Sequence, residues 1–350
     1  MAGLEFAFGR LAVRKAPSFT LGMEEESLLD ARGSRDLAAD PPEAAFAACQ
    51  EVLGDQVTHE FLRCQIEVGT PVSETVGQAR ASLEHMRSCL NAASAPFGLA
   101  PMAASTHPFA EWDRLVHTGR ERYNALADDL KMVVARLVIC GMHVHVGVED
   151  EDLRIDLMGQ LAYFVPHILA LTTSSPFWRG NVSWLKSYRL AVFDELPRTG
   201  LPESFAGYSE YQRTIKTLVN AGLIEDATKI WWDLRPSDKF PTLELRIADV
   251  CTNVADAAAV AALFQCLTRM LWRLRRGNQK WRSYSRFLVE ENRWLAQRHG
   301  VSGEMVDFGR GYLVPVTDLI AELIDLLRED AQELGCENEL EHLRAIGRDV

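Results

Sequence analysis

Four segments of the chain alternate apolar and ionisable side chains with the period of a β-strand. The first, residues 20–30, carries three consecutive glutamates, Glu24, Glu25 and Glu26, between apolar residues. Because successive side chains of a strand point to opposite faces, Glu24 and Glu26 share one face and Glu25 points to the other. Like charges this close are costly to bury unless they hold a proton or a metal ion, although glutamates on a solvated edge strand are common.

The other three segments repeat this construction. They are residues 61–70, with Glu67 inside and Glu60 just before; residues 137–148, with His143 and His145; and residues 240–249, with Glu244 and Arg246. Residues two apart on a strand share a face, so the two histidines lie together, as do Glu244 and Arg246. The pattern predicts a sheet with one apolar face for helices and one charged face for chemistry.

Apolar residues at helical spacing predict helices between and after these strands. The predicted helices span residues 42–52, 73–93, 120–137, 153–171, 205–221, 254–275, 281–297, 316–334 and 339–346; a further strand spans 97–104, and 172–181 and 187–202 are predicted loops. Strands scattered among helices that cover one sheet face indicate an α+β fold. No linker divides the chain, so we expect a flexible tail at residues 1–18 and a single domain at 19–350, mostly helical from about residue 253.

Composition excludes several classes of protein. The 350 residues are 47% hydrophobic and 25% charged, as in ordinary globular proteins. A net charge of −12 argues against nucleic acid as a partner, because that binding depends on neutralising phosphates. The most apolar stretches, 157–178 and 253–272, contain polar residues that favour buried helices over membrane spans. Seven cysteines without a Cys-x-x-Cys pair, and no signal peptide, indicate reduced core thiols in a cytoplasmic protein.

The residue types on the predicted charged face indicate a particular chemistry. Carboxylates with a histidine and arginines suit a hard divalent cation together with an anionic substrate. Mg²⁺ with a nucleoside triphosphate is the commonest such pair, since Mg²⁺ takes a few carboxylates and completes its shell with phosphate oxygens and water. A structural zinc site would need cysteine pairs or closed tetrahedral spacing, and the sequence has neither.

Seven motifs, in this order, resemble the carboxylate–amine ligase family typified by bacterial YbdK, also called type 2 glutamate–cysteine ligases, in the glutamine synthetase fold superfamily. They are residues 22–26 (GMEEE), 65–67 (QIE), 141–147 (GMHVHVG), 174–180 (SSPFWRG), 187–189 (SYR), 231–237 (WWDLRPS) and 242–246 (TLELR). The similarity runs from about residue 19 to near the C-terminus. A lone Gly-x-Glu-Glu-Glu would be weak, but seven ordered motifs are highly specific.

The resemblance implies a glutamine synthetase-like antiparallel sheet with helices packed on one face and an open charged funnel on the other. ATP and Mg²⁺ (or Mn²⁺) would bind on the charged face, where ATP phosphorylates a carboxylate and an amine then displaces phosphate. The implied metal-binding residues are Glu24, Glu26, Glu67, His143 and Glu244, with Glu60 as a further candidate. Arg246 and Arg189 are implied as catalytic clamps on phosphate or substrate carboxylate, and His143 and Arg235 as cofactor-binding residues.

Several assignments stay open at this stage. Arg235 could form an ion pair or contact substrate, and His145 could support a ligand or be structural. Trp231 and Trp232 are expected to pack, and Glu25 to form a structural ion pair. The partners expected are a small acid and a small amine, glutamate and cysteine being the family default, with a homo-oligomer also open. A kinase or phosphatase acting on a small carboxylate, or a catalytically silent nucleotide- and metal-binding protein, are the alternative functions.

Overall fold

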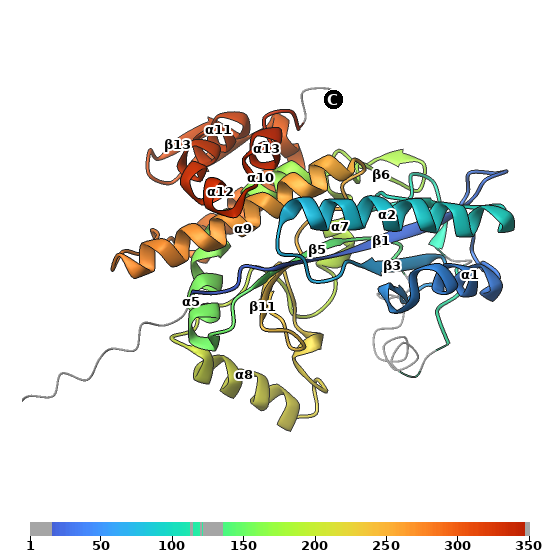
Figure 1. Ribbon diagram of the computed structural model, residues 1–350, viewed down its shortest axis with the longest axis horizontal. Helices are drawn as coiled ribbons and strands as arrows, with labels where there is room; N and C mark the ends of the chain where they lie inside the picture. Colours follow the sequence, from blue (N-terminus) through green and yellow to red (C-terminus); the bar gives the residue numbers. More distant parts are fainter. Residues whose placement is uncertain (1–15, 113–114, 120, 122–135, 347–350) are drawn as a thin grey trace, which may run out of the picture.

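A seven-stranded sheet lies at the centre of the computed structural model, which describes residues 16–112, 115–119, 121 and 136–346 (Figure 1). Its strands are β1 (Leu21–Ala31), β2 (Val57–His59), β3 (Gln65–Gly69), β4 (Leu99–Met102), β5 (Met142–Gly147), β10 (Leu234–Pro236) and β11 (Thr242–Leu245). The order is β10-β11-β5-β1-β3-β2, with β4 also paired to β1, and each of these pairings is antiparallel. The predicted α+β class and antiparallel sheet are confirmed.

Two long helices, α2 (Val76–Ser94) and α9 (Val254–Arg276), lie along one face of this sheet (Figure 1). Both begin at a capping side chain: Thr75 Oγ1 accepts the Gln78 amide at 3.2 Å, and Asn253 Oδ1 accepts the Ala255 amide at 2.9 Å. The buried residues of α2 are Val76, Ala79, Leu83, Met86, Leu90 and Ser94, which recur every three or four positions. This stripe packs on the apolar side of the strands, as the sequence pattern predicts.

Glu25 joins this helical layer to the sheet. Its carboxylate is buried and accepts two bonds from Arg87 of α2, Nε to Oε1 at 2.8 Å and Nη2 to Oε2 at 2.6 Å. The same guanidinium donates to the carbonyls of Cys251 and Thr252, at 2.5 and 2.7 Å, just before α9 begins. One residue therefore ties β1, α2 and the start of α9 together. The expected structural ion pair of Glu25 is present.

The remaining elements lie around this core. The other helices are α1 (Glu43–Leu53), α5 (Glu151–Leu161), α6 (Val165–Thr172), α7 (Tyr188–Phe193), α8 (Tyr208–Asn220), α10 (Arg286–His299), α11 (Val316–Leu326), α12 (Arg328–Leu334) and α13 (Glu337–His342). The short strand pairs are β6 (Phe177–Trp178) with β7 (Asn181–Val182), β8 (Thr199–Gly200) with β9 (Trp231–Trp232), and β12 (Glu304–Asp307) with β13 (Tyr312–Pro315).

The structure differs from the predicted elements at several points. The helix predicted at 153–171 is interrupted by a 3₁₀ turn at Ala162–Phe164, ahead of Pro166, and the helix predicted at 316–334 divides at Leu327. Helix α7 forms inside a predicted loop, and β12 and β13 form between predicted helices. Most of the predicted helix at 120–137 lies outside the described residues, as does most of the predicted tail. The single-domain prediction stays a prediction.

Two apolar helical segments are long enough to cross a membrane. Within the described part of the chain they are Glu151–Thr172 and Val254–Arg276, and 78% of the apolar window of each is buried inside the protein. Burial of this extent is that of core helices, as the sequence predicts. All seven cysteines are free, and all but Cys89 are buried. Burial raises the pKa of the Cys64 thiol to about 12, so it stays protonated and unreactive at neutral pH.

The ion pair between Glu25 and Arg87 gives a stability prediction. Replacing Arg87 with Met removes the partner of a buried carboxylate, so we expect a loss of about 3 kcal/mol in the free energy of unfolding, measured by urea denaturation. The double variant Glu25→Leu with Arg87→Met removes both charges and should recover most of that loss. Equal losses in the single and double variants would contradict the pairing.

Candidate active site

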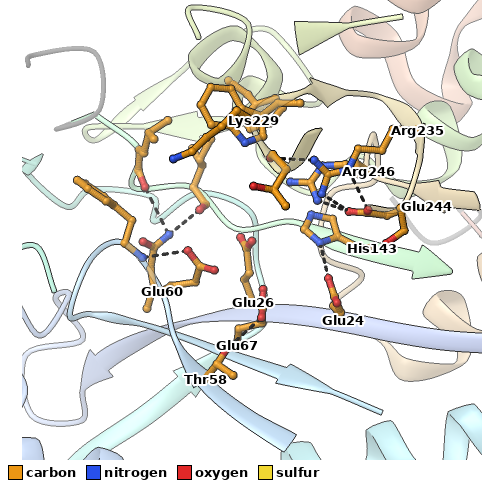
Figure 2. Close-up of a pocket in the computed structure, with 18 of the residues that line it drawn as sticks. Glu24, Glu26, Thr58, Glu60, Glu67, His143, Lys229, Arg235, Glu244 and Arg246 are labelled. Carbon is orange, nitrogen blue, oxygen red and sulfur yellow. Dashed lines mark hydrogen bonds and ion pairs between the residues drawn. The ribbon is translucent and has the colours of Figure 1, made fainter. Parts of the chain in front are cut away.

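Strand register brings the predicted ionisable residues together on the sheet face away from α2. Glu24 of β1 lies directly opposite His143 of β5, and Glu26 lies opposite Glu67 of β3. On the other side of β5, His145 lies opposite Glu244 of β11. Directly opposed residues on antiparallel strands have close Cβ atoms, so their side chains interact. The result is one continuous band of charged groups across four strands, seen in Figure 2.

This band forms one wall of a cavity of about 440 Å³. All of the site residues predicted from the sequence line it: Glu24, Glu26, Glu60, Glu67, His143, Arg189, Arg235, Glu244 and Arg246. Figure 2 shows the glutamates of β1 and β3 at the bottom of the view, with Arg235 and Arg246 beside Glu244. The structure thus places the whole predicted set at a single site, while the role of each residue stays a prediction.

The acidic part of the cavity offers three overlapping sets of metal donors. In each set one atom per residue lies within 4.8 Å of the others: Glu24, Glu67 and His143; Glu24, His145 and Glu244; Glu26, Glu60 and Glu67. Thr58 Oγ1 donates to Glu67 Oε1 at 3.0 Å and orients that carboxylate. Mostly oxygen donors, with one imidazole in two of the sets, fit Mg²⁺ or Mn²⁺ better than a soft metal.

Crowding of carboxylates changes their acidity. Burial and the nearby Glu67 raise the pKa of Glu26 to about 7, and burial with Glu60 and Glu24 raises the pKa of Glu67 to about 8. Glu24 is half-buried, but its two histidine neighbours outweigh the effect of burial and hold its pKa well below the usual range. The metal-free carboxylate pair of Glu26 and Glu67 therefore retains protons near neutral pH, which a divalent cation would displace.

His143 is a neutral imidazole at physiological pH. Burial and the charge of Arg246 lower its pKa to about 4, against the opposing effect of Glu24. Its Nδ1 lies 3.1 Å from Glu24 Oε2. A neutral ring is the form that ligates metals, so the protonation state of His143 suits its predicted role.

Arg235, Arg246 and Glu244 form a compact ionic group at the opposite end of the band. Arg235 donates a two-pronged pair to Glu244, Nε to Oε2 and Nη2 to Oε1, both at 2.9 Å, and Arg246 contacts the same carboxylate. These cations hold the pKa of Glu244 far below its usual range although burial opposes them. Of the two alternatives left open for Arg235, the ion pair is observed. Arg235 of β10 and His145 of β5 thus lie opposite Glu244 on its two sides.

Arg189 of α7 reaches the pocket just beyond the C-terminal end of β11. Its Nη1 and Nη2 donate to the carbonyls of Ile247 and Arg246, each at 3.2 Å. This approach requires Gly141, because a Cβ there would lie 2.5 Å from Arg189 Nη2. The Gly141 amide in turn donates to Glu26 Oε2 at 2.7 Å. Gly141, the first glycine of the GMHVHVG motif, therefore donates a hydrogen bond to a carboxylate and leaves the space that an arginine occupies.

Three buried nitrogens in this cavity have no hydrogen-bond partner among the described residues: Nε of Arg189, Nε of Arg246 and Nε2 of His145. Buried polar groups are almost always hydrogen-bonded in native proteins, and exceptions concentrate where a ligand binds. Donors on two guanidinium groups suit an anion such as a phosphate or carboxylate. The nearby Nε2 of His145, 3.5 Å from Glu24 Oε1, suits a shared cation.

The sequence left the role of His145 open between supporting a ligand and being structural, and the structure places it in a donor set. Two further residues of the site were missed. Trp231 lines the cavity with Arg198 against its ring at 5.4 Å, whereas its neighbour Trp232 packs in the core as expected. Lys229 also lines the wall that faces the glutamates, and only 12% of its side chain is exposed (Figure 2). Nothing in its local sequence marks it as a site residue.

Comparison with known proteins gives the class of the protein. Residues 20–349 match the sequence model of glutamate–cysteine ligase family 2. A protein of Rhodospirillum rubrum named "Putative glutamate--cysteine ligase 2" is 62% identical over 336 residues, which are 95% of this chain and 86% of that protein. A protein of the same name from Jannaschia sp. is 56% identical over 328 residues, 94% of this chain and 86% of the relative.

These matches and the site define an ATP-dependent carboxylate–amine ligase. The chain belongs to glutamate–cysteine ligase family 2, so the family and ligase class predicted from its motifs are confirmed. Its fold is similar to that of the glutamate–cysteine ligase of Francisella tularensis in complex with AMP, with a TM-score of 0.68 at 13% identity, covering 95% of this chain and 82% of that one. At that identity the likeness shows the fold alone.

Glu67→Gln tests the acidic part of the site. The change keeps the shape of the side chain and an acceptor for Thr58 but removes a negative charge from two donor sets. We expect ADP formation to fall by a factor of at least about 10² because a charge-stabilising group is lost. Glu84→Gln, at an exposed carboxylate of α2 paired with Arg80, is the matched control and should leave the rate unchanged. Equal rates in the two variants would exclude Glu67 from the site.

The raised pKa values of Glu26 and Glu67 predict how stability depends on pH. Both folded-state pKa values exceed the ordinary 4.5, so the folded metal-free protein binds more protons and loses stability as the pH rises through about 7 to 8. His143, whose pKa is about 4, opposes this while its unfolded imidazole, with an ordinary pKa of 6.5, still binds a proton, so the effect is measured above about pH 7. The Tm should therefore fall between about pH 7 and 8.5 in EDTA, and fall less with Mn²⁺, which replaces the protons. Identical slopes with and without Mn²⁺ would contradict the carboxylate site.

Proposed function

We propose that this protein joins a small carboxylic acid to an amine through an acyl phosphate, using ATP and Mg²⁺ or Mn²⁺ in the cavity described above. The observation that supports this best is that three sets of metal donors and three arginines line the same cavity of about 440 Å³. Phosphoryl transfer needs little covalent help from a protein and depends on positioning and charge neutralisation. The cavity supplies both kinds of charge for that purpose.

The carboxylates of β1 and β3 would hold the cation. Glu24, Glu67 and His143 form one candidate donor set, and Glu26 with Glu60 and Glu67 forms another. When bound, the metal would neutralise the negative charge of the ATP phosphates. We further propose that this charged side of the sheet is the open funnel of a glutamine synthetase-like fold, since the helices α2 and α9 occupy the other side (Figure 1).

Arg246 and Arg189 would stabilise the transferring phosphoryl group. Their buried Nε atoms are unpaired among the described residues and lie in the same cavity as the carboxylates. Arg246 contacts Glu244 through Nη1, and its Nε has no hydrogen-bond partner among the described residues. No serine or cysteine nucleophile is needed, in keeping with the burial of six of the seven cysteines.

Glutamate and cysteine are the first acid and amine to test, because the relatives at 62% and 56% identity carry those substrates in their names. Nucleophilic attack of the amine on the acyl phosphate forms the amide bond and releases phosphate. A kinase or phosphatase using the same site would instead form ADP or phosphate without an amine. Amine-dependent ADP release, screened over amino acids and amines, separates these reactions.

Arg246 provides a test of the acyl phosphate and of its stabilisation. Arg246→Lys should lose nearly as much activity as Arg246→Ala, a factor of about 10² to 10³, because a point charge cannot replace the planar fork. The acid is supplied with ¹⁸O in its carboxylate, and released phosphate is analysed by mass spectrometry. Transfer of one ¹⁸O per phosphate is expected. Amide formation without label in the phosphate would exclude the acyl phosphate.

A further inference from the structure

A buried arginine outside the cavity connects the two elements that carry Arg189 and Arg246. Arg293 of α10 is 9% exposed and makes two bidentate ion pairs. With Asp233 it bonds through Nε and Nη2, at 2.7 and 3.1 Å, and with Asp194 through Nη1 and Nη2, at 2.8 and 2.9 Å. Every guanidinium nitrogen is used, so the geometry of this group is strongly defined.

Each aspartate leads to one arginine of the cavity. Asp194 ends α7, where its amide bonds to the Leu190 carbonyl at 2.9 Å, and α7 carries Arg189 in its first turn. The carbonyl of Asp233 accepts the amides of Arg246 and Ile247, at 2.8 and 3.1 Å. Arg293 therefore acts on Arg189 through a helix and on Arg246 through backbone hydrogen bonds.

The connection closes into a ring. Arg189 donates to the carbonyls of Arg246 and Ile247, the same two residues whose amides bond to Asp233. Starting at Arg293, the path runs through Asp233, the backbone at 246–247, Arg189 and α7, and returns through Asp194. In a closed ring of hydrogen bonds and ion pairs a displacement of one member strains its neighbours, so a change at Arg293 reaches both cavity arginines.

We propose that Arg293 is a positioning residue that sets the separation of the Arg189 and Arg246 guanidinium groups without touching substrate; this inference rests on the proposed function. Small errors in the placement of reacting groups are costly, and a shift of about 1 Å from a distant mutation can lower a rate about 10²-fold. The donors Glu24, Glu26 and Glu67 on β1 and β3, and His143 on β5, lie outside the ring, so metal binding by these residues should not depend on Arg293.

A purely structural arginine would behave differently, and the chain offers a matched control. Arg273 of α9 also pairs with a buried aspartate, Asp330, through Nε at 3.2 Å and Nη2 at 2.7 Å. It belongs to the helical layer and does not line the cavity. Arg273→Ala should lower the Tm but leave kcat per folded molecule within about twofold of the wild type.

The test compares Arg293→Ala and Arg293→Lys with Arg273→Ala. Folded fraction is measured by circular dichroism, Mn²⁺ and ATP binding by titration calorimetry, and kcat and KM by ADP formation. For both Arg293 variants we expect kcat per folded molecule to fall about 10- to 100-fold, with weaker ATP binding and unchanged Mn²⁺ affinity. Lysine should restore stability more than it restores kcat. It keeps a positive charge beside the aspartates but cannot form a bidentate ion pair with each of them.

Chemical rescue adds a readout that a stability effect would not produce. Arg293, Asp194, Trp294 and Gln297 line a second, open cavity of about 390 Å³ on the far side of the ring. Ethylguanidinium can enter from there and occupy the space left by Arg293→Ala. It should restore part of kcat in that variant, whereas ethylammonium at the same ionic strength should not, and neither should affect Arg273→Ala.

Two outcomes would overturn the inference: kcat per folded molecule within twofold of the wild type in Arg293→Lys, or equal losses in the Arg293 and Arg273 variants. If the wild-type protein itself forms no ADP with any acid and amine, the proposed function fails separately. ATP and Mn²⁺ titrations then decide the role of Arg293. Weaker ATP binding in Arg293→Lys with unchanged Mn²⁺ affinity upholds the inference, and unchanged ATP binding overturns it.

Discussion

Charge balance on one face of a β-sheet is the constraint on which this structure depends. Five glutamates and three arginines share a single cavity, and burial makes each unpaired charge expensive. At the Glu244 end arginines already provide the balance, and the pKa of that carboxyl is held very low. At the Glu26 and Glu67 end no cation of the described chain does so, and protons are retained instead. The imbalance marks where a divalent cation would bind.

The strand period separates this chemistry from the support of the fold. Of three consecutive glutamates, Glu24 and Glu26 face the cavity, whereas Glu25 turns to the helices and pairs with Arg87. The same division recurs at the outer layer, where Arg293 holds two aspartates behind the cavity while Arg189 and Arg246 face into it. Glu25 and Arg293, away from the cavity, are thus paired, whereas Nε of Arg189 and Nε of Arg246 have no hydrogen-bond partner among the described residues.

The sheet and the acidic residues of the site could be predicted from the sequence because both depend on local alternation. Glu24, Glu26, Glu67 and His143 each stand among apolar residues in a strand pattern, and register then brings them together. Lys229 and the ring around Arg293 could not be found, since they depend on loops and helices that meet only in the folded chain. Helix α7 was missed because its six residues are too few for a periodic signal. Strands β12 and β13 were missed because a short hairpin between helices has too few residues to show a clear alternation of apolar and polar positions.

The most direct test of this account is a crystal structure with Mn²⁺ and a non-hydrolysable ATP analogue, with the metal located by its anomalous scattering. The account predicts an anomalous peak within about 2.0 to 2.3 Å of carboxylate oxygens of Glu24, Glu26 or Glu67, with the analogue's phosphates against Arg189 and Arg246. Mn²⁺ bound elsewhere, or phosphates held away from both arginines, would contradict the assignment of this sheet face as the site of the ligase.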